Sequence, residues 1–185
     1  SILQVGDVLS VCLPETPPPE DSTTQPTVIR QKRPWAEGAA VVIENETGHV
    51  LALTGGYGAS LEGFVRATQA RRQPGSSFKP LVYALAFAQP LGPDGKPPFT
   101  AAHAVVNSPH TFKTPQGNWS PRNVGGEYSS MACLAQGLAW SQNIATAALL
   151  EELGGPKPLI AFAKKMGYDT SKFPEELGLA LGQAE

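Results

Sequence analysis

The chain has 185 residues, of which 19 are Gly and 18 are Pro, so about one residue in five is a turn former. This excess excludes a coiled coil or a simple helical bundle, whereas 41% hydrophobic residues suffice for a packed core. The formal net charge of −2 gives no electrostatic reason to expect nucleic acid or an anionic membrane surface as a partner. No run of about 18 apolar residues occurs, and the first residues do not resemble a signal peptide.

Residues 1–35 are predicted to be a linker that carries short strands. Apolar and polar residues alternate over residues 1–13, a pattern typical of one or two strands. Residues 14–34 are rich in Pro, Ser, Thr and charge, which indicates a loop with one short strand near Val28 and Ile29.

Two apolar runs separated by turn residues predict a β-hairpin. The runs are residues 38–43 and 50–54, and the turn between them is Glu-Asn-Glu-Thr-Gly. Because neither run alternates cleanly with polar residues, we expect both faces of the hairpin to be covered.

Helical periodicity follows, interrupted by one long loop. Helices are predicted over residues 76–88, 130–140, 144–153 and 158–166, and residues 90–123 are expected to be mostly loop. Such a long loop inside a compact domain is often functional. Strands followed by helices indicate an α/β chain of the α+β type, with an antiparallel sheet flanked by helices.

Ser76 and Lys79 form the first candidate catalytic pair. At three-residue spacing both side chains lie on one face of a helix, where a neutral lysine amine could take the serine proton. The amine is neutral near pH 7 only if burial or neighbouring cations lower its pKa. The alternative is that Ser76 only caps the helix. A capping box would place Glu or Gln three residues on, whereas this chain places a cation there, near the positive end of the helix dipole.

Ser141 and Asn143 form a second candidate pair in the break between two predicted helices. Alone, Ser141 is equally well explained as the N-cap of the helix that follows. Ser-x-x-Lys followed by Ser-x-Asn is, however, the order of motifs in active-site serine β-lactamases and penicillin-binding proteins.

Longer stretches around these motifs resemble class A penicillin-binding proteins, the bifunctional peptidoglycan synthases. The resemblance covers about residues 36–185, and Val65 stands where the family usually has Asn. It implies that these residues are the N-terminal part of a transpeptidase domain with the β-lactamase/penicillin-binding fold. It rests on the hairpin at residues 38–56, the nucleophile block at 64–80, Trp119-Ser-Pro-Arg-Asn123, Gly126-Glu-Tyr128, Ser141-Gln-Asn143 and Ala180-Leu-Gly182.

The resemblance implies a role for each motif residue. Ser76 would be the acylated nucleophile and Lys79 its base, while Ser141 would relay a proton and Asn143 would hold Lys79 or the substrate amide. It implies no cofactor, a periplasmic location with a membrane anchor outside this chain, and two ligands: the D-Ala-D-Ala end of a peptidoglycan stem peptide, and β-lactams. Further substrate contacts would come from Gly75, Ser77, Trp119 and Asn123.

The family's third motif, Lys-Ser/Thr-Gly, does not occur in the 185 residues. Lys113-Thr114-Pro115 precedes Ser141 instead of following it, lies in the predicted loop, and has a proline without an N–H to donate. We therefore expect the rest of the transpeptidase domain, in the same polypeptide or as a second chain, to complete the site. We expect the 185 residues alone to acylate slowly or not at all.

Three alternatives stay open at this point. The chain could be a non-catalytic periplasmic interaction module, a β-lactamase or a D,D-carboxypeptidase.

The histidines and cysteines suggest no further chemistry. His49, His103 and His110 show no metal-ligand spacing, so no metal is expected. Cys12 and Cys133 are too few for a disulfide scaffold, and the sequence leaves their pairing open.

Overall fold

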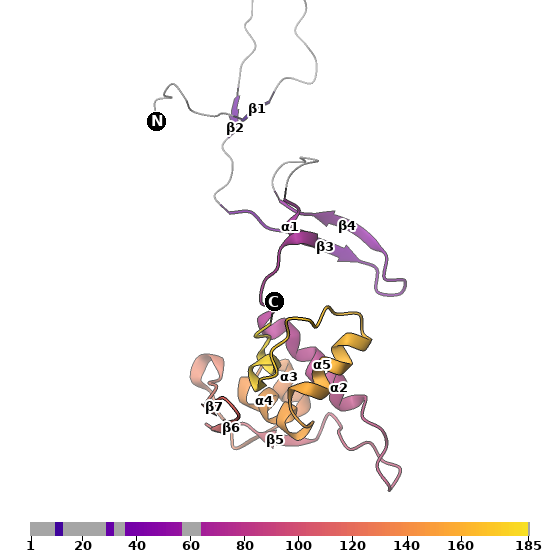
Figure 1. Ribbon diagram of the computed structural model, residues 1–185, viewed down its shortest axis with the longest axis vertical. Helices are drawn as coiled ribbons and strands as arrows, with labels where there is room; N and C mark the ends of the chain where they lie inside the picture. Colours follow the sequence, from indigo (N-terminus) through magenta and orange to yellow (C-terminus); the bar gives the residue numbers. More distant parts are fainter. Residues whose placement is uncertain (1–9, 13–28, 32–35, 57–63, 185) are drawn as a thin grey trace, which may run out of the picture. The chain divides into compact units, whose positions relative to one another are not determined.

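The computed structural model describes residues 10–12, 29–31, 36–56 and 64–184 (Figure 1). The chain divides into two compact units, residues 1–70 and 71–185, and each is described by itself. Most of the predicted linker, residues 1–35, lies outside the described residues.

The first unit contains two antiparallel strand pairs. Strands β1 (Ser10–Cys12) and β2 (Ile29–Gln31) pair with Ser10 opposite Gln31. This agrees with the short strands predicted in the two halves of the linker. Strands β3 (Ala40–Ile43) and β4 (Val50–Thr54) form the predicted hairpin, with Ala40 opposite Thr54. A short helix that the sequence did not predict, α1 (Arg66–Gln69), begins where the N–H of Arg66 donates to the carbonyl of Gly55 at 3.0 Å.

Within the first unit, the described elements leave the hairpin uncovered, so the prediction that both of its faces are covered is not met there. Every residue of β3 and β4 is exposed, and the exposed fraction reaches 64% at Leu51. A continuous apolar run identified the strands correctly. Burial depends on partners elsewhere in space, which such a run does not reveal.

The second unit is built around a set of short helices (Figure 1). The predicted helix at residues 76–88 is a 3-10 turn, η1 (Gly75–Phe78), followed by α2 (Lys79–Phe87). Helix α4 (Asn143–Glu152) lies at the centre of the core, with seven consecutive buried residues from Ile144 to Leu150. The other elements are α3 (Leu134–Ala139), α5 (Pro156–Lys165), and the 3-10 turns η2 (Val124–Gly126) and η3 (Leu177–Leu181).

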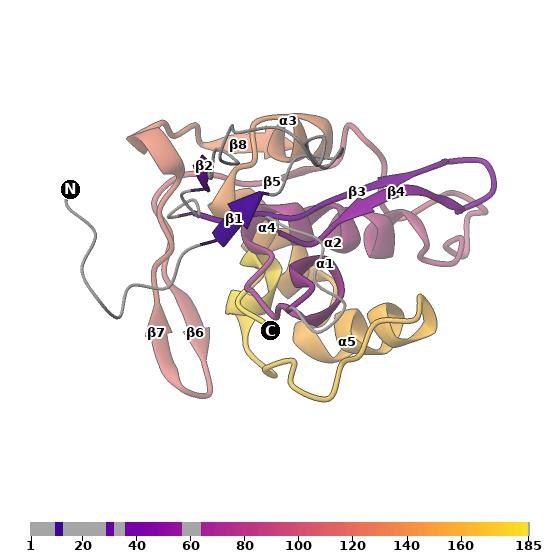
Figure 2. The same ribbon diagram turned by 90° about the horizontal axis from the view of Figure 1, so that it is seen from above.

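Short strands occupy part of the region that was predicted to be loop. Strand β5 (Ala104–Val106) pairs with β8 (Met131–Cys133), and β6 (Phe112–Thr114) pairs with β7 (Gly117–Trp119). Figure 2 shows the β6–β7 pair as a hairpin, whose turn lies at residues 115–116. The predicted helix at 130–140 is therefore partly wrong, because its first residues form β8. A three-residue apolar run does not distinguish a strand from a helical turn.

The antiparallel pairs and packed helices agree with the predicted α+β class. Within the described part of the chain, no helix is both long and apolar enough to cross a bilayer.

Candidate active site

Ser76 lies in η1, the turn that leads into α2. Ser76 is exposed, and its hydroxyl makes no hydrogen bond to any other residue that the structure describes. The structure does not support the capping alternative, because neither η1 nor α2 receives a side-chain cap. The turn begins at Gly75 with φ of +56°, a conformation that glycine adopts at little cost.

Lys79 is the first residue of α2 and is only 1% exposed. Its Nζ donates to three acceptors: the carbonyl of Ser141 at 2.5 Å, the Asn143 Oδ1 at 2.6 Å and the Ser141 Oγ at 3.0 Å. An ammonium group has three N–H donors, so all of them are satisfied. A buried charge is tolerated only when it is hydrogen-bonded in this way.

Burial also changes the acid–base behaviour of this amine. It lowers the pKa of Lys79 from 10.5 to about 8, because the ammonium form loses its hydrating water. The sequence offered burial or neighbouring cations as possible causes, and burial accounts for the shift. Arg66 instead pairs with Glu37 at 2.5 Å, and Arg71 lies 3.7 Å from Asp169.

The backbone between α3 and α4 turns Ser141 toward the lysine. Ser141 has φ of +51° and is the only described residue other than glycine with a positive φ. This left-handed conformation is unfavourable for a residue with a Cβ and clusters at functional sites. Here both the carbonyl and the hydroxyl of the same residue contact Lys79 Nζ.

Asn143 is held from the opposite side by the segment before η2. Its Nδ2 donates to the carbonyl of Arg122 at 2.7 Å, and its backbone N–H donates to Asn123 Oδ1 at 2.9 Å. With Nδ2 bound to a carbonyl, the Oδ1 is left to face Lys79. Asn123 is buried, with 7% of its surface exposed.

A second contact locks α2 against α4 one turn further on. The hydroxyls of Tyr83 and Thr146 lie 3.2 Å apart, and Thr146 Oγ1 donates to the carbonyl of Gln142 at 2.7 Å. A Cβ at position 137 would lie 2.6 Å from the Tyr83 hydroxyl, so α3 approaches this pair closely only because residue 137 is glycine. The separation between Lys79 and the Ser141–Asn143 turn is thus fixed by the packing of three helices.

Comparison with known proteins agrees with this arrangement. The family described as penicillin binding protein transpeptidase domain matches residues 38–178. The chain belongs to this family. Penicillin-binding protein 1A from Neisseria meningitidis serogroup A is 34% identical over 183 residues, which cover 90% of this chain and 21% of that protein. Penicillin-binding protein 1B from Haemophilus influenzae is 32% identical over 163 residues, which cover 87% of this chain and 20% of that protein.

Solved penicillin-binding proteins share the fold. The crystal structure of penicillin-binding protein 1A from Haemophilus influenzae aligns with a TM-score of 0.68 at 30% identity, over 80% of this chain and 21% of that one. PonA1 from Mycobacterium tuberculosis aligns with a TM-score of 0.61 at 31% identity, over 80% of this chain and 38% of that one. The chain therefore covers part of a transpeptidase domain, and it spans about a fifth of the length of the curated relatives it matches.

The structure brings together three of the four residues for which this family membership implies catalytic roles. Lys79, Ser141 and Asn143 are in direct contact, and Ser76 lies three residues before Lys79 in the adjoining turn. Ser141 is not the cap of α4, because its side chain faces the lysine. The catalytic roles themselves stay predictions.

The predicted substrate contacts are more scattered. Gly75 and Ser77 flank Ser76, and the Ser77 hydroxyl donates to the carbonyl of Pro74 at 2.6 Å. Trp119 lies on β7, where its ring packs against Phe112 with centroids 5.7 Å apart. The contacts of these residues with a substrate stay predictions.

Gly182 is a residue of the transpeptidase-like region whose local role the sequence did not reveal. A Cβ there would lie less than 3.0 Å from the backbone of Gly75, directly before Ser76. Gly182 also has φ of +75°. The end of η3 therefore supports the turn that carries Ser76, over a sequence separation that no local pattern spans.

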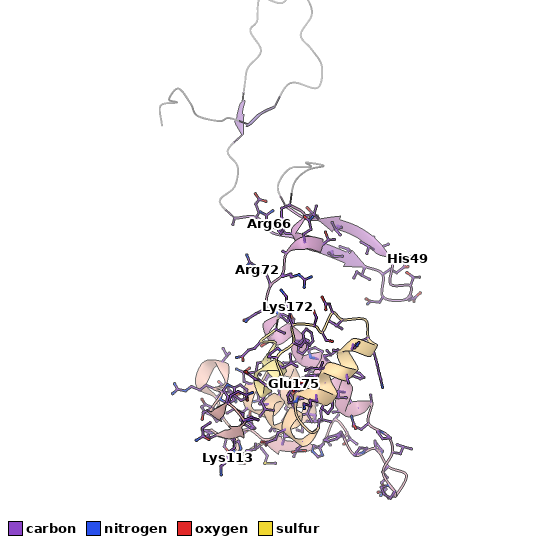
Figure 3. The ribbon with its side chains drawn as sticks, in the orientation of Figure 1. His49, Arg66, Arg72, Lys113, Lys172 and Glu175 are labelled. Carbon is purple, nitrogen blue, oxygen red and sulfur yellow. The ribbon has the colours of Figure 1, made fainter. Side chains whose placement is uncertain are left out.

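Lys113 lies on β6, not in a loop as predicted, and is exposed at the edge of the β6–β7 hairpin (Figure 3). His103 pairs with Glu152 at 2.8 Å. Among the residues that the structure describes, no three His, Cys, Asp or Glu side chains gather closely enough to hold a metal ion. Cys133 is a free cysteine.

Proposed function

We propose that the protein is a serine-type D,D-transpeptidase of peptidoglycan, acting on the D-Ala-D-Ala end of stem peptides outside the cytoplasmic membrane. The observation that carries the proposal is the buried Lys79 amine, held by Ser141 and Asn143 one turn after an exposed serine. An amine with a pKa of about 8 is neutral in about a tenth of molecules at pH 7, which suits a general base.

The contacts of Lys79 indicate how the proton moves. When the amine is neutral it keeps two N–H groups and gains a lone pair. The Ser141 carbonyl and Asn143 Oδ1 can only accept, so they retain the two N–H groups. The lone pair then replaces the N–H group that faces Ser141 Oγ. Lys79 can take the Ser76 proton there and exchange a proton with Ser141 Oγ.

Acylation on this scheme begins when Ser76 Oγ attacks the carbonyl of the penultimate D-Ala as its proton moves to Lys79. The C–N bond to the terminal D-Ala then breaks, and Ser141 supplies the proton that the leaving amine needs. Lys79 returns its proton to Ser141, which leaves an ester on Ser76. An amine of a neighbouring stem peptide then attacks this ester, loses a proton to the relay and releases Ser76. A β-lactam follows the first step only, because its opened ring stays attached to Ser76.

Intact mass of the complete protein, with the rest of the transpeptidase domain present, after incubation with benzylpenicillin tests the proposal. We expect one stoichiometric adduct that peptide mapping places on Ser76, and its loss in Ser76→Ala. Ser130→Ala is the matched control, because Ser130 is exposed and its hydroxyl makes no hydrogen bond to another described residue. An adduct that persists in Ser76→Ala would refute the proposal and favour the non-catalytic interaction module.

Product analysis separates the transpeptidase from its hydrolytic alternatives. A synthetic stem pentapeptide with an acceptor amine should yield D-Ala and a cross-linked dimer. Rapid release of penicilloate, or of D-Ala without a dimer, would instead identify a β-lactamase or a D,D-carboxypeptidase.

A further inference from the structure

Helix α4 begins at the catalytic motif without a side-chain cap from its own sequence. The residue before it, Gln142, makes no capping hydrogen bond, and the Ser141 side chain faces Lys79. The first N–H groups of a helix have no partner within the helix and need an acceptor from elsewhere. Asn123 supplies it from 20 residues earlier, because its Oδ1 accepts the N–H groups of Asn143 at 2.9 Å and Ile144 at 3.1 Å.

The other end of the Asn123 side chain is equally fixed. Its Nδ2 donates to Asn107 Oδ1 at 3.0 Å and to the carbonyl of Glu127 at 3.1 Å. Asn107 is fully buried and is itself held, because its Nδ2 donates to Ser129 Oγ at 3.0 Å. An amide side chain has two donors and two acceptor sites, so every hydrogen-bonding position of Asn123 is used inside the protein.

We propose that Asn123 is a positioning residue that anchors the start of α4, so that Asn143 and Ser141 face Lys79 in the geometry needed for acylation of Ser76. It acts with its neighbour Arg122, whose carbonyl fixes the Asn143 amide. Asn143 is thus held at its backbone and its side chain by two consecutive residues, while its Oδ1 holds Lys79. This inference rests on the proposed function.

The inference differs from the substrate contact predicted for Asn123. Four internal hydrogen bonds leave its amide no free donor or acceptor, and the residue is buried. A substrate contact would require at least one of these bonds to break. The positioning role requires all four to persist during turnover.

Two substitutions in the intact protein separate the parts of this role. Asn123→Ala removes the acceptor of the Asn143 and Ile144 N–H groups. Asn123→Asp keeps that acceptor and, at a helix N-terminus, carries a favourable negative charge. It can bond to Asn107 if the Asn107 amide turns over. We therefore expect the rate of acylation by benzylpenicillin to fall at least tenfold in Asn123→Ala. In Asn123→Asp we expect at least half of this loss, measured as the logarithm of the rate, to be recovered.

Leu159→Ala is the matched control for lost stability. It truncates a fully buried side chain on α5, a helix that carries none of the candidate site residues. In Asn123→Ala we expect the pH midpoint of the acylation rate to move by at least half a unit, and in Leu159→Ala to stay unchanged. A folded Asn123→Ala protein with an unchanged midpoint, or Leu159→Ala with an equal shift, would overturn the inference.

Amide hydrogen exchange provides a readout that does not depend on activity. Exchange at the N–H groups of Asn143 and Ile144 should accelerate much more in Asn123→Ala than in Leu159→Ala. Unchanged exchange in Asn123→Ala would contradict the anchoring role. Failure of the wild-type protein to acylate would instead refute the proposed function, and the exchange rates would still decide whether Asn123 holds α4.

Discussion

The β3–β4 hairpin and the α2–α4 helix pair differ in how the polarity of their residues relates to burial. The hairpin consists almost wholly of apolar residues, yet all of them are exposed. The helix pair buries Lys79 and Thr146 as completely as its leucines. Apolar composition thus indicates where a strand forms, whereas burial follows from which partners each side chain finds.

The contrast bears on function because buried polar groups surround the candidate site. Lys79 at the start of α2 is buried with three acceptors. Asn123, which precedes η2 and holds the start of α4, is buried with four partners.

The largest effect is expected from removing the buried amine. Lys79→Met should slow acylation by benzylpenicillin about 100-fold or more, since a general base contributes about 10²–10⁴-fold. Lys113→Met is the matched control, because Lys113 is exposed on β6, and it should acylate at the wild-type rate. Stopped-flow or quench measurements give both rates. A Lys79→Met protein that acylates normally would show that the buried lysine is only structural.

Two leucines test the contrast in burial directly. Leu150→Ala in α4 should lower the free energy of unfolding of the 185-residue chain by about 2–5 kcal/mol, because the side chain is fully buried. Leu51→Ala in β4, where Leu51 is 64% exposed, should change it by about 0.5 kcal/mol or less. Urea unfolding measures both values. Equal losses would mean that the hairpin is buried in solution.

The close approach of Gly182 to Gly75 predicts a smaller effect on stability. Gly182→Ala should destabilise the protein by about 2–4 kcal/mol, from overpacking together with an alanine at positive φ. Gly95→Ala has nearly the same φ, +72°, but open space around its Cβ, and should lose only about 1 kcal/mol. Denaturant midpoints of the two variants give the difference. If they are equal, the contact does not constrain the turn that carries Ser76.

The smallest change in stability is expected from substitution of Gln142. Its Oε1 is buried and, among the described residues, has no hydrogen-bond donor. Gln142→Met removes this unpaired acceptor while keeping a similar volume, so stability should rise by up to about 1 kcal/mol. Thermal unfolding of the variant measures the change, and a clear loss of stability would indicate that Oε1 has a partner in solution.

The sequence predicted the local elements well where a pattern was long enough. The hairpin and helices α2, α4 and α5 follow from apolar runs and turn residues, with shifts of a few residues at their ends. The helix predicted at residues 130–140 includes Met131–Cys133, which form β8, because three residues are too few to show a period. The short strands β5, β6 and β7 lie among turn residues, which obscured them.

The candidate site was predicted less evenly than the fold. Ser76, Lys79, Ser141 and Asn143 came from two motifs and a family resemblance, and the structure joins the last three. The internal role of Asn123 and the contact between Gly182 and Gly75 were not predictable. Each joins segments far apart in the sequence and depends on hydrogen-bonding geometry or close backbone approach, which residue spacing does not encode.

The pH dependence of acylation tests most directly whether the buried Lys79 is the base for Ser76. A base must be neutral to act, and burial lowers the pKa of Lys79 to about 8. The rate of benzylpenicillin acylation of the intact protein should therefore rise about tenfold per pH unit below pH 8 and level off above it. A rate that is flat between pH 6 and 10, or one that still rises at pH 10 as for an ordinary lysine, would contradict this account.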